Sequence, residues 1–197
     1  MRLIDIAALL AIALTVAAYV PYVAAIRAGR VKPHFFSWLI WTLTTSIVCV
    51  AQLAADGGMG AWPTAMSALI TAYVAWLALV LKSDFSNTPA DTGFLLAALF
   101  SLPAWFFTSD PLWSVVILTL VDGLGFGPTL RKAWARPHEE SLPFYAVFAL
   151  RSMLSCYALE SRTLTTLLFP AAMVVACVLV CALLWWRRAR VTAAPGA

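Results

Sequence analysis

Pro33-His34-Phe35-Phe36-Ser37 returns in this chain as Pro137-His138-Glu139-Glu140-Ser141, and Pro63-Thr64-Ala65-Met66 returns as Pro170-Ala171-Ala172-Met173. The two matches are offset by 104 and 107 residues, so one connecting loop differs in length by three residues. A block that is duplicated inside an apolar chain is typical of membrane transporters built from repeats, in which the substrate path lies between the halves.

The composition indicates that lipid surrounds most of the chain. Of the 197 residues, 63% are hydrophobic and only 11% are charged, and the mean hydropathy is +0.90. A soluble domain of this size lacks the interior to hide so much apolar surface. The net charge of +4 does not indicate nucleic acid as a partner, because the basic residues lie in short loops between apolar runs.

Seven apolar runs of about 17–24 residues can be delimited. Each is long enough to cross a hydrocarbon core of about 30 Å as a helix. Lipid excludes open strands, so helices are predicted throughout. The predicted spans are Leu3–Ile26, Phe35–Ala55, Ala61–Leu81, Thr92–Thr108, Leu112–Leu130, Leu142–Leu159 and Leu164–Trp186.

The distribution of basic residues predicts the orientation. With the N-terminus outside and the C-terminus in the cytoplasm, ten of the 13 Lys and Arg residues lie in inside segments. Only Arg2 and Arg162 lie outside, and Arg151 lies within an apolar run. Basic residues in short loops remain on the cytoplasmic side. We therefore expect a multi-pass protein of the plasma or inner membrane.

The repeats fit this topology as parallel units. Residues 1–82 form the first three-helix repeat, 111–188 form the second, 83–110 form a linker helix, and 189–197 form a cytoplasmic tail. Three crossings would invert the second unit, and the linker helix restores its orientation. The predicted fold class is an all-α integral membrane protein with seven transmembrane helices in a 3+1+3 arrangement.

The chain resembles the PQ-loop superfamily, as a divergent, bacterial-type member; this superfamily includes the SWEET sugar transporters and the lysosomal cystine and cationic amino acid exporters. The resemblance covers nearly the whole chain and rests on Pro21 and Pro128, on the basic loops after them and on the repeated proline-to-serine segments. Tyr22 and Thr129 stand where the family usually has Gln. The sugar branch has an Asn on the third helix of each unit, whereas the single Asn here, Asn87, lies in a loop.

This resemblance implies that the chain transports a small polar solute, such as a sugar, an amino acid or a similar metabolite, by alternating access between two three-helix bundles. Pro21 and Pro128 then act as a symmetric pair of hinges. Proline removes one backbone hydrogen bond and bends a helix, so a static kink is the alternative role.

Two charges lie deep in the second repeat, Asp122 and Arg151. Charges at mid-membrane are costly and usually face the bundle interior with a partner. We expect the two side chains to face each other or to share a polar cavity. Three roles stay open for them: a structural ion pair, proton coupling through Asp122, and binding of an anionic substrate group by Arg151.

Aromatic and hydroxyl side chains complete the predicted pocket. Trp41 and Tyr145 occupy equivalent places in the repeats and can flank a planar or sugar-like solute, whereas Trp38 is assigned to an interfacial belt. Ser67 and Thr71 are the polar groups on the third helix. The predicted substrate-binding residues are Trp41, Thr45, Ser67, Thr71, Asp122, Tyr145 and Arg151.

Two alternatives remain at this stage. The bacterial nicotinamide riboside transporters share the seven-helix plan and a Trp-x-x-Trp signature, which Trp38-Leu39-Ile40-Trp41 matches. A non-transporting receptor or accessory protein can use the same fold. An enzyme is not expected, because no nucleophile–base pair is visible. His34 and His138 lie on separate loops, so no metal or other cofactor is predicted, and an oligomer is compatible with the sequence.

Overall fold

The computed structural model describes residues 2–82 and 84–192, and within these ranges every regular element is a helix. The elements are α1 (Leu3–Arg27), α2 (Phe35–Ala54), η1 (Gly58–Ala61), α3 (Trp62–Val80), α4 (Pro89–Thr108), α5 (Leu112–Ala135), η2 (Pro137–Glu139), α6 (Leu142–Ala158) and α7 (Leu164–Thr192). The all-helical class predicted from the sequence is confirmed.

Within the part of the chain that the structure describes, five helical segments are long and apolar enough to cross a membrane. They are α1, α2, the continuous η1–α3 segment, α4 and α7. Helices α5 and α6 contribute shorter apolar stretches in the described residues, Leu112–Gly127 and Leu142–Ala158. Length and composition are thus compatible with a membrane-embedded protein.

The helices begin where a side chain can satisfy their first N–H groups. His34 precedes α2, and its Nδ1 accepts a hydrogen bond from the Ser37 backbone N–H at 3.4 Å. Thr88 and Asp91 form a reciprocal capping box at the start of α4. Ser141 caps α6 in the same way as His34 caps α2. Capping of this kind fixes a helix start because those N–H groups have no partner within the helix.

Helices α5 and α7 continue past the predicted ends at Leu130 and Trp186. Where they run side by side, Arg187 Nε donates to the Trp134 carbonyl at 3.0 Å, and its guanidinium carbon lies 4.8 Å from the centroid of that ring. Arginine is also a good helix former. The predicted cytoplasmic tail therefore begins inside α7, and residues 193–197 lie outside the described part of the chain.

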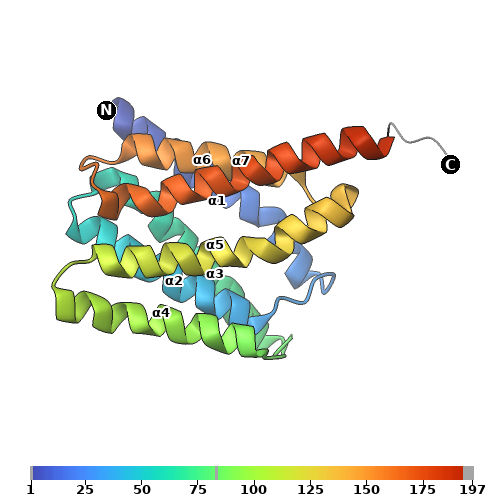
Figure 1. Ribbon diagram of the computed structural model, residues 1–197, viewed down its shortest axis with the longest axis horizontal. Coiled ribbons are helices and arrows are strands. Elements are labelled where there is room, and N and C mark those ends of the chain that lie inside the picture. Colours follow the sequence, from blue (N-terminus) through green and yellow to red (C-terminus); the bar gives the residue numbers. More distant parts are fainter. Residues whose placement is uncertain (1, 83, 193–197) are drawn as a thin grey trace.

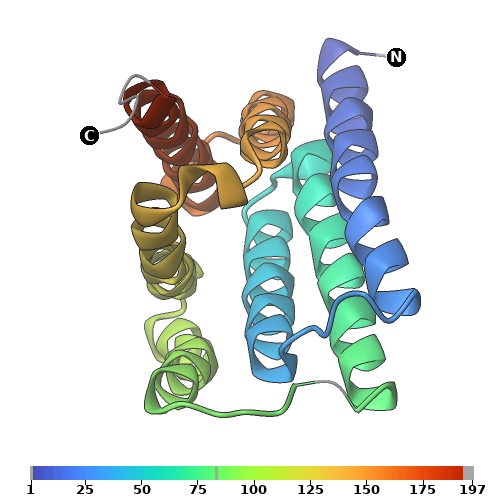
Figure 2. The ribbon, with the colours of Figure 1, turned by 90° about the vertical axis from the view of Figure 1, so that its right-hand side faces the viewer.

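Two groups of three helices pack in matching ways (Figure 2). Helix α3 packs against α1 and α2, and α7 packs against α5 and α6. Between the groups, α1 packs against α6 and α5 packs against α2. If α1 is paired with α5, α2 with α6 and α3 with α7, each of these contacts has a counterpart. Helix α4 has no equivalent in this pairing and packs beside α5 and α2.

The helices run back and forth along the long axis, so their connections gather at two ends (Figure 1). The start of α1 and the α2–α3, α4–α5 and α6–α7 connections lie at one end, which we call the Arg2 end. The α1–α2, α3–α4 and α5–α6 connections and the end of α7 lie at the other, which we call the Lys32 end.

Small residues line the helix contacts, while large apolar residues cover the outside. Ala8 and Ala158 are fully buried where α1 meets α6, and small side chains let helices approach closely in lipid. On the outer face, Phe106 and Phe107 of α4 are 79% and 82% exposed. Apolar surface of this kind suits a lipid environment. One buried cluster joins α2, α4, α5 and α7: Ile47, Val48, Ala51, Ala98, Val115, Leu118, Phe169 and Met173.

Candidate functional site

One internal cavity of about 550 Å³ is lined by both groups of helices. Its lining comes from α1, α2, α3, α5, α6 and α7 and from the α1–α2 loop, and α4 supplies none of the described lining residues. Lys32 and His34 line it at the Lys32 end, where Lys32 is exposed to solvent. The cavity therefore has its mouth at that end.

A second hollow lies on the outer face and has a different character. It is an open groove of about 810 Å³ along α1 and α3, lined mainly by apolar side chains such as Val16, Val20 and Leu69. Ligand sites combine an apolar wall with a few convergent polar groups. The internal cavity has such groups, and we take it as the candidate site.

All seven substrate-binding residues predicted from the sequence line the internal cavity: Trp41, Thr45, Ser67, Thr71, Asp122, Tyr145 and Arg151. Of the two predicted hinges, Pro21 lies inside α1, immediately before Tyr22, which also lines the cavity. Pro128 falls within the range of α5, but its side chain lies outside the described part of the structure. Residues chosen for their charge, hydroxyl and aromatic chemistry thus meet in one place.

Arg151 reaches from α6 across to the first group of helices. Its side chain is buried, and Nη1 donates hydrogen bonds to Thr15 Oγ1 on α1 at 3.1 Å and to Ser67 Oγ on α3 at 2.6 Å. The guanidinium carbon lies 5.1 Å from the centroid of the Phe148 ring. Nε has no hydrogen-bond partner among the described residues. Arg151 therefore joins the two groups of helices and keeps unused donor capacity beside the cavity.

Asp122 contributes a buried carboxyl group from α5. Its side chain lines the cavity, is 9% exposed, and its Oδ1 has no hydrogen-bond partner among the described residues. Among the described residues, no ion pair joins Asp122 to Arg151. The two charges share a cavity, as one of the sequence alternatives proposed, without forming a direct pair. Leaving a buried carboxyl oxygen without a donor is costly, and the direct Asp122–Arg151 ion pair is not formed.

Hydroxyl groups form an acceptor-rich wall on α2 and α3. Thr45, Ser67 and Thr71 each donate to the carbonyl four residues earlier in their own helix, at 2.7, 3.1 and 2.9 Å. Because each hydroxyl donates its proton to a backbone carbonyl, its oxygen offers lone pairs to other donors. The Ser67 oxygen accepts a hydrogen bond from Arg151 Nη1 in this way. Thr45 Oγ1 and Thr71 Oγ1 are 3.4 Å apart. This wall suits hydrogen-bond donors on a solute.

Aromatic rings cover much of the remaining lining. Trp38 is only 6% exposed and lines the cavity, so its assignment to an interfacial belt is wrong. Its ring meets Trp41 edge to face, with centroids 5.0 Å apart, and lies 5.2 Å from the ring of Tyr22. On another wall, Tyr19 meets Phe148 edge to face at 5.6 Å. These rings offer both faces and edges to a planar group.

Sequence reasoning missed Trp38, Tyr19, Tyr22 and Phe148 as cavity residues. A signal for Trp38 was present, because positions 38, 41 and 45 are spaced to lie on one face of a helix. The interfacial-belt assignment rests on the predicted depth of Trp38 in the membrane and ignores which face of the helix Trp38 occupies. The positions of Tyr19 and Phe148 depend on how α1 and α6 are rotated against each other, which no local pattern encodes.

The Arg2 end is closed by contacts between the two groups of helices. Two backbone hydrogen bonds of 3.2 Å join residues 160–161 to residues 56–57. A Cβ on Gly60 would lie only 2.5 Å from the backbone nitrogen of Leu159, so the two connections touch through their main chains. Such close packing leaves no room for a solute at this end.

A buried side chain completes the closure next to a proline. Pro170 inside α7 has no N–H, so the carbonyl of Thr166, four residues earlier, loses its helical donor. Gln52 of α2 replaces that donor, with Nε2 at 2.9 Å from the Thr166 oxygen. Gln52 is fully buried. This bond links the first group of helices to the second at the closed end.

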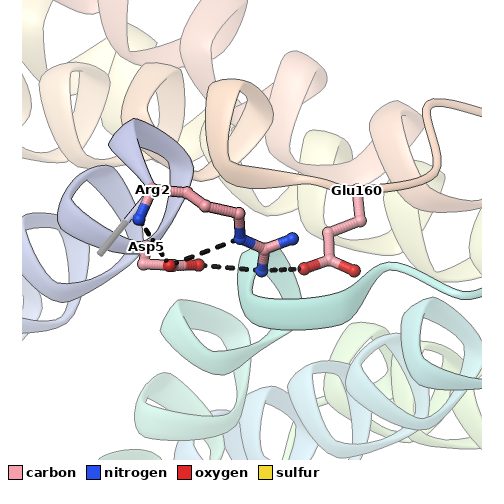
Figure 3. A network of polar contacts seen from close by, with 3 residues as sticks. All are labelled: Arg2, Asp5 and Glu160. Atoms are coloured by element: carbon pink, nitrogen blue, oxygen red, sulfur yellow. Dashed lines mark hydrogen bonds and ion pairs between the residues drawn. The ribbon is translucent and has the colours of Figure 1, made fainter.

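Arg2 adds an ion-pair cluster at the rim of the same end (Figure 3). Its Nη2 contacts Asp5 Oδ1 at 2.9 Å and Glu160 Oε1 at 2.5 Å. The side chains of Arg2 and Glu160 are 60% and 38% exposed, and exposed pairs contribute about 0–1 kcal/mol. The cluster therefore helps the closure less than the buried contacts do.

Both ring nitrogens of His34 are engaged in local contacts. Its Nδ1 caps α2, and its Nε2 lies 2.5 Å from the Ser86 carbonyl, which ties the α3–α4 connection to the start of α2. Within residues 2–82 and 84–192, no group of three or more His, Cys, Asp or Glu side chains is placed to hold a metal ion.

Comparisons with models of known protein families, with curated proteins and with solved structures give no match. What the cavity can do is inferred from its own residues. A buried guanidinium, a buried carboxylate, an acceptor-rich wall and several rings can together hold a small solute with polar and planar parts.

Proposed function

We propose that this protein is an integral membrane transporter of a small polar solute, such as a sugar, an amino acid or a similar metabolite, working by alternating access between two three-helix units. The observation that carries the proposal is the cavity of about 550 Å³, lined by both groups of helices and closed at one end. Small-molecule sites typically measure about 300–1,000 Å³. A site between two units that opens at one end at a time is what alternating access requires.

The proposed architecture has seven membrane crossings in a 3+1+3 arrangement, as in the PQ-loop superfamily. The matched contacts of α1–α3 with those of α5–α7 support two parallel repeats, residues 1–82 and 111–188. The position of α4 beside the bundle, away from the cavity, supports its role as a linker. Rocking of one unit against the other would then open the Arg2 end and close the Lys32 end.

The proposed orientation puts the Lys32 end in the cytoplasm of a plasma or inner membrane. The ten basic residues assigned to inside segments fall in the connections and helix ends at the Lys32 end. Positively charged loops remain on the cytoplasmic side. In this orientation the structure represents an inward-open state with a closed outer end.

The alternatives account for the cavity less well. A receptor or accessory protein of the same fold has no need for buried unpaired charges in an internal cavity. A nicotinamide riboside-type transporter gains support from Trp38 and Trp41, the two tryptophans of the Trp-x-x-Trp match, because both line the cavity. Such a substrate, however, is a cation without an anionic group, so it would pair with Asp122 and leave the buried Arg151 guanidinium without an ionic partner.

Counterflow into proteoliposomes tests the proposal. Vesicles containing the full chain are loaded with one unlabelled solute, and uptake of the same labelled solute is measured for sugars, amino acids and nucleosides at several pH gradients. We expect at least one class to exchange faster than in protein-free vesicles. Dependence on the pH gradient that is lost in Asp122→Asn would assign proton coupling to this protein through that carboxyl group. Exchange of no solute in the panel would contradict a transport function.

A matched pair of tryptophan variants separates cavity chemistry from general damage. Trp41 and Trp76 are both about half exposed, at 40% and 54%, but only Trp41 lines the cavity. We expect Trp41→Ala to slow exchange roughly 3- to 10-fold, because the solute then has one ring fewer to pack against, and Trp76→Ala to leave it unchanged. Equal effects of the two substitutions would argue against this cavity as the transport site.

A further inference from the structure

The cavity holds a buried guanidinium, that of Arg151, and a buried carboxyl group, that of Asp122, that do not pair with each other. Arg151 and Asp122 are both more than nine-tenths buried, and no ion pair joins them. Each also retains a buried polar atom without a hydrogen-bond partner among the described residues, Nε of Arg151 and Oδ1 of Asp122. In a structural ion pair, by contrast, the two groups would satisfy each other.

A solute with one kind of charge would engage only one of the two groups. An anion would pair with Arg151 and leave Asp122 as a neutral, protonated carboxyl group, and a cation would pair with Asp122 and leave Arg151 without an anion. An unpaired buried charge is costly. A solute that carries one carboxylate and one ammonium group can satisfy both, because guanidinium matches a carboxylate and carboxylate accepts from an ammonium. The other basic lining groups, Lys32 and His34, lie at the mouth.

The lining also includes aromatic residues that can pack against a ring in the solute. Trp38 and Trp41 meet edge to face on one wall, and Phe148 lies beside the Arg151 guanidinium. Aromatic groups prefer offset or edge-to-face arrangements with other rings. The volume of about 550 Å³ exceeds what a small aliphatic solute would fill.

We infer that the solute is an aromatic zwitterion, an aromatic amino acid or a compound with the same three groups, with its carboxylate on Arg151, its ammonium on Asp122 and its ring among Trp38, Trp41 and Phe148. This inference rests on the proposed function, because it names the cargo of the same cavity. It also makes a claim about binding that is measured without transport.

Calorimetric titration of the purified full chain in detergent tests the inference directly. The probes are L-phenylalanine and L-tryptophan, with 3-phenylpropionate lacking the ammonium, 2-phenylethylamine lacking the carboxylate, L-alanine lacking the ring, and glucose lacking all three. Removing either charged group from the solute should weaken binding roughly 10- to 100-fold. Analogues that bind as tightly as the amino acids would overturn the inference, as would a failure of both aromatic amino acids to bind at millimolar concentration.

Two variants test which side chain binds which charged group of the solute. Asp122→Asn should weaken L-phenylalanine binding roughly 10-fold or more and bind 3-phenylpropionate at least as tightly as the unaltered protein does, since that probe has no ammonium. Arg151→Gln should weaken L-phenylalanine binding and bind 2-phenylethylamine at least as tightly as the unaltered protein does, since that probe has no carboxylate. Because Arg151 also bridges three helices, a loss of folding in that variant leaves Asp122→Asn and the analogue series as the decisive measurements. Unchanged L-phenylalanine binding by Asp122→Asn would overturn the assignment.

The outcomes separate this inference from the proposed function. Selective binding of aromatic amino acids without counterflow would support the zwitterion-binding site and contradict the proposed transport function. Counterflow of a sugar or nucleoside without amino acid binding would support the transport function and contradict the inference that the solute is a zwitterion.

Discussion

At the scale of single residues, Arg151 shows how one side chain can serve both fold and site. A buried cation is tolerated where its N–H groups find acceptors, and Nη1 finds them in Thr15 and Ser67. Both hydroxyls donate their own protons to backbone carbonyls, so their oxygens are oriented as acceptors. The same guanidinium keeps Nε without a partner among the described residues, and its side chain lines the cavity.

Thr15→Val tests the structural half of this role. Thr15 and Thr42 both donate to the carbonyl four residues earlier at 2.7 Å, but only Thr15 accepts from Arg151. Removing its hydroxyl leaves a buried charged donor short of an acceptor, so we expect a loss of about 1–3 kcal/mol in the free energy of unfolding. Thr42→Val should lose distinctly less. Thermal unfolding of the two variants in detergent makes the comparison, and equal losses would show that the bond to Arg151 contributes nothing.

At the scale of helices, the sequence predicts where each helix lies along the chain better than it predicts which helices contact one another. Hydropathy located the starts of α2, α5, α6 and α7, because apolar runs and capping residues are local signals. Hydropathy predicts that α7 ends at Trp186, because the apolar run stops before Arg187. The helix continues to Thr192, and Arg187 donates a hydrogen bond to the Trp134 carbonyl of α5. Five of the seven predicted site residues carry charged or hydroxyl groups, which stand out in an apolar chain, and Trp41 and Tyr145 follow from their equivalent places in the two repeats; all seven line the cavity. The bond between Gln52 and Thr166 spans 114 residues and depends on packing, so no local pattern could have predicted it.

Gly60 tests the close approach of η1 to the α6–α7 connection. A Cβ at this position would meet the backbone of Leu159, whereas a Cβ on Gly123 of α5 would meet nothing within 4 Å. Gly60→Ala should therefore destabilise the fold by about 1–3 kcal/mol through overpacking. Gly123→Ala should stabilise it by about 0.5–1 kcal/mol, because alanine suits a helix interior better. Thermal unfolding in detergent measures both, and a neutral Gly60→Ala would mean that the two connections do not touch.

At the scale of the whole molecule, the two ends differ in how they are held. The Lys32 end carries the mouth of the cavity, while the Arg2 end is closed by backbone contacts, by Gln52 and by the Arg2–Glu160 cluster. The proposed alternating access would require this closure to break and re-form in each cycle, so its contacts should be strong enough to seal and weak enough to open. A few hydrogen bonds supply that balance.

The relative strength of these interactions predicts which variant opens the Arg2 end. Gln52→Leu removes the buried donor that Pro170 makes necessary, leaving the Thr166 carbonyl unpaired, whereas Glu160→Gln removes one exposed ion pair. We measure labelling of the cavity residue Cys177 by an impermeant maleimide from the Arg2 side of vesicles, after replacing the other three cysteines with serine. Gln52→Leu should raise that labelling roughly 10-fold or more. Glu160→Gln should raise it no more than about fivefold, because exposed ion pairs contribute about 0.2–1 kcal/mol. The reverse order would mean that the rim cluster, and not the buried bond beside the proline, holds the outer end closed.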